Sequence, residues 1–192
     1  MVGDTFMWFP DTKIYGETGD RYFEKKKAFE VTNFKFNMDN KESLDSEGSS
    51  GSGSKAGKAK FQDFEITKRV DTASMPLYKA CSLATLFPSL MLACRRAGGS
   101  NVIYLQFIFR YVRVTGITWN GGEGGQLTTE VVTFNFKAMG AQYIPETSAG
   151  VADEGKRSSW SWNTITQGSS GTSTLDISGI APPPAFLDGN PS

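Results

Sequence analysis

The sequence predicts an all-β fold, a β-barrel of two antiparallel sheets with one short α-helix. Apolar and polar residues alternate in strand-like runs along much of the chain, and Gly-rich or Pro-containing segments separate these runs. The 14 phenylalanines and the clustered Val, Ile and Thr residues also favour strands over helices. A chain of 192 residues can bury the core of one domain. We place this barrel domain at residues 1–167 and expect a flexible Gly/Ser/Pro-rich C-terminal tail at 168–192.

Two strand regions are expected before residue 40: a short strand over residues 5–9, and a second region that starts at Tyr22 and Phe23. Pro10 ends the first of them. The apolar residues of the second region change alternation phase partway along, from Phe29 and Val31 to Phe34, Phe36 and Met38. A phase change of one residue turns every later side chain to the other face, so a bulge or bend is predicted near Thr32–Asn33.

Residues 40–58 are predicted to form a mobile loop. The segment contains one large apolar side chain, Leu44, and it cannot bury enough surface to offset the entropy of ordering it. Its Gly, Ser and Lys residues suggest a phosphate-binding loop by composition. They lack the spacing of that motif, however, and no apolar strand leads directly into them.

A strand, a short helix and a second strand are expected to follow this loop. Residues 64–70 alternate as a half-buried strand, with Phe64, Ile66, Lys68 and Val70 in one phase. A helix at 75–84 follows several candidate N-cap residues and tolerates Pro76 within its first turn. Its apolar residues recur at helical spacing. Pro88 prevents the helix from continuing, and a strand is expected at 90–94.

The longest strand is predicted over residues 102–118, and its two faces differ. One face is almost wholly apolar and is expected to lie in the core: Ile103, Leu105, Phe107, Phe109 and Tyr111. The other face is mixed and is expected to be partly buried against a loop, a helix or another subunit: Tyr104, Gln106, Ile108, Arg110 and Val112. A glycine turn at Asn120–Gly125 joins this strand to one at 127–138, with Val132, Phe134 and Phe136 inward. A last short strand is expected at 159–163.

No catalytic, cofactor-binding or metal-binding residues are predicted, and we do not expect an enzyme. The chain has no histidine, so the usual activation of a Ser or Cys nucleophile is absent, and spacing singles out no acid/base pair of carboxylates. Equal numbers of basic and acidic residues give no overall field that would attract nucleic acid. Stable membrane insertion is not expected, because no apolar run approaches the about 20 residues of a membrane-spanning helix.

Three further features bear on compartment and binding. Cys81 and Cys94 are expected to be reduced, small apolar residues, although a bridge between helix and strand stays open. The N-terminal segment lacks the basic and apolar regions of a secretory signal, so we expect cytoplasmic assembly and export without a signal peptide. Trp119, Trp160 and Trp162 either cap an end of the barrel or form a platform on which a sugar stacks.

Several motifs follow one another in a fixed order between residues 5 and 167: FEITKRVDTASMPLYKACS, FPSLMLACRRAGG, YLQFIFRYVRVTGITW, GGEGGQLTTEVVTFNF and RSSWSWN. In this combination they resemble the Hcp (haemolysin-coregulated protein) family, which builds the inner tube of bacterial type VI secretion systems. The resemblance implies a β-barrel subunit flanked by a helix, which forms hexameric rings that stack into a tube. It also implies three kinds of partner: sheath proteins, spike proteins, and effector proteins carried in the lumen. The chain departs from the family pattern in its loop at 40–58 and in its tail after residue 167.

A ring requires that two different faces of the subunit meet. We name four candidate interface residues, Leu44, Tyr104, Ile108 and Val112; the alternative for the last three is that they pack under the predicted helix. Two other functions stay open from the residues alone. The chain could be a tail-tube subunit of another contractile injection machine, or a monomeric secreted β-sandwich that binds glycans or protein.

Overall fold

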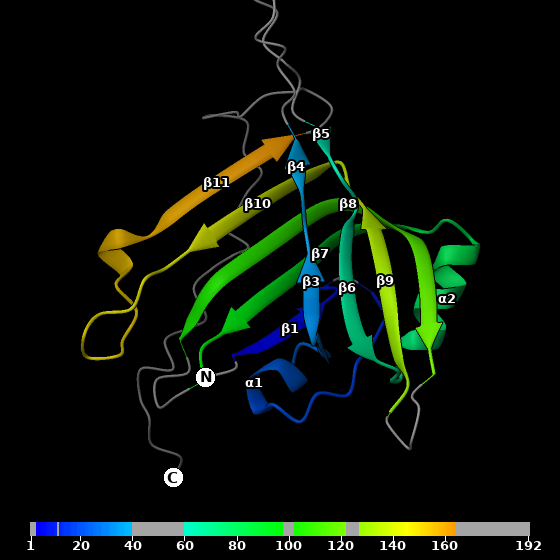
Figure 1. Ribbon diagram of the computed structural model, residues 1–192, viewed down its shortest axis with the longest axis horizontal. Coiled ribbons are helices and arrows are strands. Elements are labelled where there is room, and N and C mark those ends of the chain that lie inside the picture. Colours follow the sequence, from blue (N-terminus) through cyan, green and yellow to red (C-terminus); the bar gives the residue numbers. More distant parts are fainter. Residues whose placement is uncertain (1–2, 11, 40–59, 98–101, 122–126, 164–192) are drawn as a thin grey trace, which may run out of the picture.

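The computed structural model describes residues 3–10, 12–39, 60–97, 102–121 and 127–163 (Figure 1). Within these ranges the chain forms eleven strands, two short α-helices and one 3-10 helix. The elements, in chain order, are β1 (Asp4–Trp8), α1 (Arg21–Glu24), β2 (Phe29–Glu30), β3 (Asn33–Lys35), β4 (Met38–Asp39), β5 (Lys60–Phe61), β6 (Phe64–Arg69), α2 (Ser74–Ser82), β7 (Leu86–Arg95), β8 (Ile103–Asn120), β9 (Thr129–Asn135), β10 (Ala138–Tyr143), η2 (Glu154–Lys156) and β11 (Ser158–Asn163).

One antiparallel sheet closes into a barrel, as the sequence predicts. Its strands lie in the order β2-β1-β7-β8-β9-β6-β3, and β4 and β5 form a separate pair. The strands at the two ends of this order, β2 and β3, are almost consecutive in the chain. Val31 N donates to Thr5 O at one end, and Thr32 N donates to Thr67 O at the other, both at 2.8 Å. The predicted bend near Thr32 is therefore confirmed, and it is the place where the sheet closes.

β8 is the longest strand and turns a corner that alternation alone did not reveal. Its first half pairs with β10 and its second half with β9, while β7 follows its opposite edge. At the junction Tyr111 has a φ of 53°, a conformation that shifts the alternation by one residue. Tyr111 is 56% exposed and Val112 is completely buried in the barrel core. The predicted placement of Tyr111 in the core is wrong, and so is that of Val112 on the mixed outer face.

β7 begins earlier than predicted because Pro88 lies at this same corner. The strand starts at Leu86, and Pro88 falls between the paired residues Phe87 and Ser89, opposite Tyr111. Proline lacks an N–H and is tolerated in strands mainly at bulges and edges. The irregularity of β8 at this position therefore allows a strand to run through Pro88.

Two clusters of buried side chains lie on the two faces of the curved sheet. The larger fills the barrel and includes Phe29, Phe64, Phe109, Phe134 and Leu77. The smaller lies outside the barrel and is covered by α1. The sequence indicates a strand from Tyr22 onward, but this segment is a helical turn. Asp20 Oδ1 accepts hydrogen bonds from the backbone N–H groups of Tyr22 and Phe23, which caps the turn. Phe23 then stacks on Phe6 with ring centroids 4.0 Å apart.

The predicted helix is confirmed as α2, which buries Leu77 and Ala80 against the barrel. The residues predicted to face inward on the strand at 127–138, namely Val132, Phe134 and Phe136, are also buried. The strand predicted at 127–138 is split, because the chain turns after Asn135 beside the corner of β8 and continues as β10. β10 was missed, since its sequence AMGAQY shows no alternation.

β11 extends the sheet beyond β10, and the predicted strand at 159–163 is confirmed. The helices of the described part are too short and too polar to cross a lipid bilayer. The predicted loop at 40–58 and the tail at 168–192 lie outside the described residues, and β4 and β5, which pair with each other, flank the loop.

Candidate functional site

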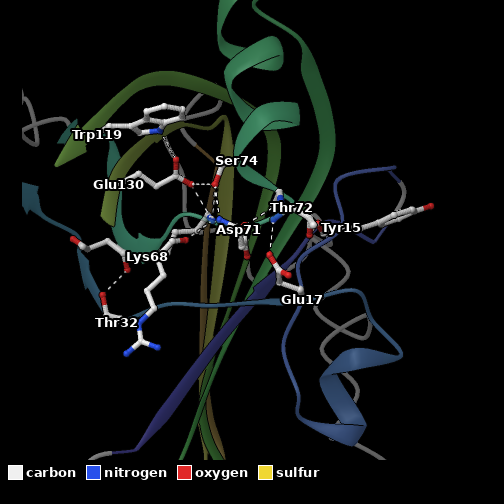
Figure 2. A network of polar contacts seen from close by, with 12 residues as sticks. Tyr15, Glu17, Thr32, Lys68, Asp71, Thr72, Ser74, Trp119 and Glu130 are labelled. Carbon is white, nitrogen blue, oxygen red and sulfur yellow. Dashed lines mark hydrogen bonds and ion pairs between the residues drawn. The ribbon is translucent and has the colours of Figure 1, made fainter. Parts of the chain in front are cut away.

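Lys68, Glu130 and Trp119 form a row across three neighbouring strands. In the pairing of β6, β9 and β8, Glu130 lies opposite Lys68 on one side and opposite Trp119 on the other. Lys68 Nζ lies 2.9 Å from Glu130 Oε1, and Trp119 Nε1 donates to Glu130 Oε2 at 2.8 Å (Figure 2). The side chains of Lys68 and Glu130 are both completely buried. A salt bridge with hydrogen bonds to both carboxylate oxygens is thus enclosed within the fold.

The same network fixes the start of α2 on the barrel. Ser74, the first residue of α2, donates from Oγ to Glu130 Oε1 at 2.8 Å and accepts from Asp71 N at 3.0 Å. Asp71 Oδ1 lies 2.5 Å from Lys68 Nζ and accepts from Ala73 N at 2.9 Å. Figure 2 shows these groups converging where β6 ends and α2 begins. The buried lysine therefore connects two strands and the helix.

Ser74 and Lys68 are the residue types of a catalytic Ser–Lys pair, but here the serine hydroxyl is not accessible to a substrate. Ser74 Oγ lies 3.3 Å from Lys68 Nζ, yet Ser74 is completely buried and its hydroxyl donates to Glu130. Burial raises the pKa of the Asp71 carboxyl, an effect that Lys68 opposes and the nearby charge of Glu17 reinforces. No substrate reaches the Ser74 hydroxyl in this position, so we assign the network a structural role.

The alternation of apolar and polar residues in the sequence indicates that Lys68 and Glu130 are buried. Lys68 has the same phase as Phe64 and Ile66, and Glu130 has the same phase as Val132 and Phe134, so both charged residues occur where an apolar residue is expected. A charged residue in the inward phase of a strand is rarely buried unless it is paired. The sequence does not identify the partners, because Lys68 and Glu130 are distant in the chain.

One exposed apolar surface lies over α2, and we call it the helix patch (Met75, Tyr78 and Trp119). Met75 and Tyr78 are three positions apart on the helix and share its outer face. Tyr78 contacts Trp119 edge to face with ring centroids 4.9 Å apart. Met75 is 58% exposed, and the two aromatic residues are about two-fifths exposed. The helix patch therefore offers a contiguous apolar surface at one side of the barrel.

A second exposed surface is the strand edge, which we define as β11 with Trp160 and Trp162. β11 pairs with β10 along one edge, and no other described strand pairs with it. The two tryptophans stack with centroids 6.3 Å apart, and each lies 6.0 Å from the ring of Phe61. Figure 1 shows β11 on the opposite side of the molecule from α2. Trp119 therefore does not join the other two tryptophans in a single sugar-stacking platform.

The four predicted interface residues have different environments. Val112 is completely buried in the barrel core that also contains Leu77 of α2, and Ile108 is buried in the outer cluster. Neither has exposed area to give to a second subunit. Tyr104 is half-buried and contacts Tyr143 edge to face at 6.5 Å, so it remains a candidate. Leu44 lies outside the described residues.

A pocket of about 710 Å³ lies beside β1 and the end of β6, and it is rich in carboxylates. Arg95 binds Asp4 at 2.8 Å and Asp20 at 2.5 Å. Glu30 accepts a hydrogen bond from Thr18, and Glu17 accepts one from Thr72 N. Most of the pocket's polar groups therefore bind one another. Within the described part of the chain, no three His, Cys, Asp or Glu side chains are grouped so that they would hold a metal ion.

The two cysteines are free in the structure and differ in environment. Cys94 is buried, and burial raises the pKa of its thiol against a weaker opposite effect of Thr5. Cys81 is half-buried at the end of α2. Because the thiolate is the reactive form, we expect a thiol reagent to modify Cys81 at least about 10-fold faster than Cys94 in the native protein at neutral pH. Peptide mass spectrometry after timed alkylation measures both rates; equal rates would contradict the difference in burial.

Comparisons with known proteins agree on one family. The model of the family described as "Type VI secretion system effector, Hcp" matches residues 6–143. Protein hcp1 of Pseudomonas aeruginosa is 34% identical over 107 residues, which is 55% of this chain and 65% of hcp1, so the chain spans slightly less than two thirds of that relative. The solved structure of a type six secretion system protein superposes with a TM-score of 0.76 at 27% identity, covering 87% of this chain and 99% of that one. Hcp1 of Salmonella typhimurium shares the fold, with a TM-score of 0.66 at 22% identity over 86% and 97% of the two chains. The chain therefore belongs to the Hcp family of type VI secretion system proteins.

Proposed function

We propose that this protein is a structural subunit of a type VI secretion tube, in which it forms hexameric rings that stack and are exported. The observation that carries the proposal is the presence of two different exposed surfaces, the helix patch and the strand edge, on opposite sides of one barrel (Figure 1). A ring closes when each copy presents one such surface to the next copy and the other to the previous one. The buried network supports this role, because it holds the helix patch rigidly on the barrel.

The chemistry of the two surfaces suits a direct contact between copies. The strand edge presents backbone groups that pair with no other described strand and that a neighbouring chain can bind, together with Trp160, which is 38% exposed. The helix patch presents Met75 and two aromatic rings, residue types that are enriched at interfaces. The exposed Tyr143 lies on β10, the strand next to β11, and its contact with Tyr104 of β8 extends that surface.

The wider role follows from the family and remains part of the proposal. The rings would stack into a tube that carries effector proteins in its lumen and meets the sheath and spike of the secretion machine. Assembly would take place in the cytoplasm, followed by secretion without a signal peptide. Leu44 stays a candidate interface residue.

Two surface variants test the proposed contact. Met75→Lys places a charge in the helix patch, and Trp160→Lys places one at the strand edge, so each variant alone should run as a monomer in light scattering. A mixture of the two retains one intact contact, between the strand edge of the first variant and the helix patch of the second. We therefore expect a heterodimer of about twice the 20.9 kDa chain mass and no larger species.

The control for this mixture is Lys25→Glu, a charge change on an exposed residue at the end of α1, which should leave the native assembly intact. A mixture that restores full rings, or one that stays monomeric although each variant is folded, would exclude this pairing of surfaces. A Met75→Lys protein that still forms rings would show that the helix patch is not a subunit contact.

A further inference from the structure

Apolar, aromatic and basic side chains lie together on the outside of the barrel at the corner of β8, where β7 runs alongside. We call this surface the corner patch: Leu86, Pro88, Arg110, Tyr111 and Arg113. The residues that flank these positions, Phe87, Phe109 and Val112, are buried in the barrel core, so alternation places the patch on the outer face. Leu86 is 45% exposed and Tyr111 is 56% exposed. Large side chains are therefore open to solvent at this corner.

The backbone at the centre of the corner patch has an unfavourable conformation. Tyr111 has a φ of 53°, a region that bulky residues rarely occupy and that glycine occupies readily. Strained residues of this kind are concentrated at functional sites, where the strain holds a side chain in position. A glycine would form the same corner without the strain. We therefore attribute the strain to the exposed tyrosine ring rather than to the fold.

The two arginines of the corner patch have no counter-charge within the described part of the chain. Arg110 and Arg113 lie on either side of Tyr111, and neither forms an ion pair with a described residue. Arginine and tyrosine are among the residue types that contribute most to the affinity of protein interfaces. The corner patch therefore fits a protein surface that offers carboxylates beside a recess.

The carboxylate pocket, which is the pocket of about 710 Å³ beside β1 and the end of β6, is such a surface. Its lining contains five acidic and two basic residues. Glu17 and Glu30 are exposed, each accepts a hydrogen bond from an uncharged group, and neither forms an ion pair with a described residue. The volume lies in the range of pockets that hold small molecules, so the pocket has room for a side chain.

The two surfaces lie at opposite ends of the barrel. Figure 1 shows the corner of β8 at the top of the molecule, whereas β1 and the end of β6, which line the pocket, lie at the bottom. One chain therefore cannot bring its own corner patch to its own pocket, but two copies arranged head to tail can. The helix patch and the strand edge lie on the two sides of the same view, so the two kinds of contact do not compete.

We propose that the corner patch of each copy binds the carboxylate pocket of a copy in the next ring, with Arg110 and Arg113 paired with Glu17 and Glu30. Arginine and carboxylate groups form strong, charge-assisted hydrogen bonds, and Tyr111 packs on the rim of the pocket. This inference rests on the proposed tube, and it names the surfaces through which rings stack. Several copies make the contact at once, so a weak single contact is enough to hold two rings together.

Sedimentation velocity of the full-length protein over a range of concentrations tests this contact, because it separates single rings of about 125 kDa from pairs of about 250 kDa. Arg110→Glu with Arg113→Glu places an acidic corner against an acidic pocket. This double variant should weaken ring pairing at least about 100-fold and leave single rings intact. Glu17→Lys with Glu30→Lys should have the same effect, because both surfaces are then basic.

A chain that combines all four substitutions has an acidic corner and a basic pocket, and it should pair rings within about 10-fold of the native affinity. Lys25→Glu with Lys35→Glu reverses two exposed lysines elsewhere and is the matched control, which should leave ring pairing unchanged.

Tyr111→Gly separates the contact from folding. It removes the exposed ring and relieves the strain, so the urea midpoint should stay at or above the native value while ring pairing weakens at least about 10-fold.

Ring pairs that persist after either charge reversal would overturn the proposal. A fourfold variant that forms rings without pairing would also overturn it, because the corner patch would then meet a different surface. Native rings that never pair at the highest concentration reached would exclude this contact and leave the ring-forming role standing. A native chain that stays monomeric would contradict both.

Discussion

Replacing Lys68 with methionine is expected to destabilise the subunit by about 3–5 kcal/mol, the typical loss when one partner of a buried ion pair is removed. The reason lies in the two carboxylates that the ammonium contacts. Glu130 is completely buried, and Asp71 is mostly covered. Without Lys68 both keep their burial and lose their counter-charge. Urea unfolding at a fixed protein concentration, followed by far-UV circular dichroism, measures the loss.

Two controls separate charge from packing in this experiment. Adding Glu130→Gln to Lys68→Met removes the more deeply buried of the two stranded charges while keeping an acceptor for Trp119, so it should recover roughly half or more of the lost stability. Lys156→Met removes a lysine that is 76% exposed from its ion pair with Asp153 and should leave the unfolding midpoint unchanged. A single variant as stable as the native chain would refute the structural role of the network.

Replacing Phe64 with alanine is expected to cost about 3–5 kcal/mol, the usual range for removing a buried aromatic ring from a core. Phe64 is completely buried on β6 and contacts rings from two other strands. Its centroid lies 4.6 Å from Phe109 of β8 and 5.9 Å from Phe34 of β3. Since β3 is the strand that closes the barrel, we also expect faster hydrogen exchange in β3 than in β7.

Phe64→Leu keeps most of the buried volume and is expected to lose about 1–1.5 kcal/mol. Leu83→Ala, at a residue that is 65% exposed after α2, is the surface control and should change little. Urea titrations of the three variants give the free energies of unfolding. If Phe64→Ala loses no more stability than Leu83→Ala, the aromatic cluster does not hold the barrel closed.

The sequence predicts those elements of the fold whose signal lies in residues that are close together in the chain. The alternation of apolar and polar residues identifies β6, β9 and β11, and it places Lys68 in the inward phase. This works because successive side chains of a strand point to opposite faces of the sheet. The helix α2 is equally clear, since Pro76 and Pro88 restrict its position from both sides. α1 was misread as a strand because its four residues are too few for a period, and its N-cap, Asp20, is the clearest sequence signal.

The remaining features depend on contacts between distant segments. The corner at Tyr111 reverses the faces of β8, so Val112 moves into the core and leaves the set of interface candidates. No local pattern reveals this corner, because the residues on both sides of it still alternate. Likewise, the pairing of Lys68 with Glu130 is set by the register of β6 on β9, and the strand edge exists because nothing described pairs with the far side of β11.

Native mass spectrometry of the purified full-length protein tests the ring-forming role most directly. Six copies joined through the helix patch and the strand edge predict a principal species of about 125 kDa, six times the 20.9 kDa chain, with annular particles of the same sample in negative-stain images. A protein that stays at the mass of one chain at every concentration reached would contradict a function based on contacts between copies.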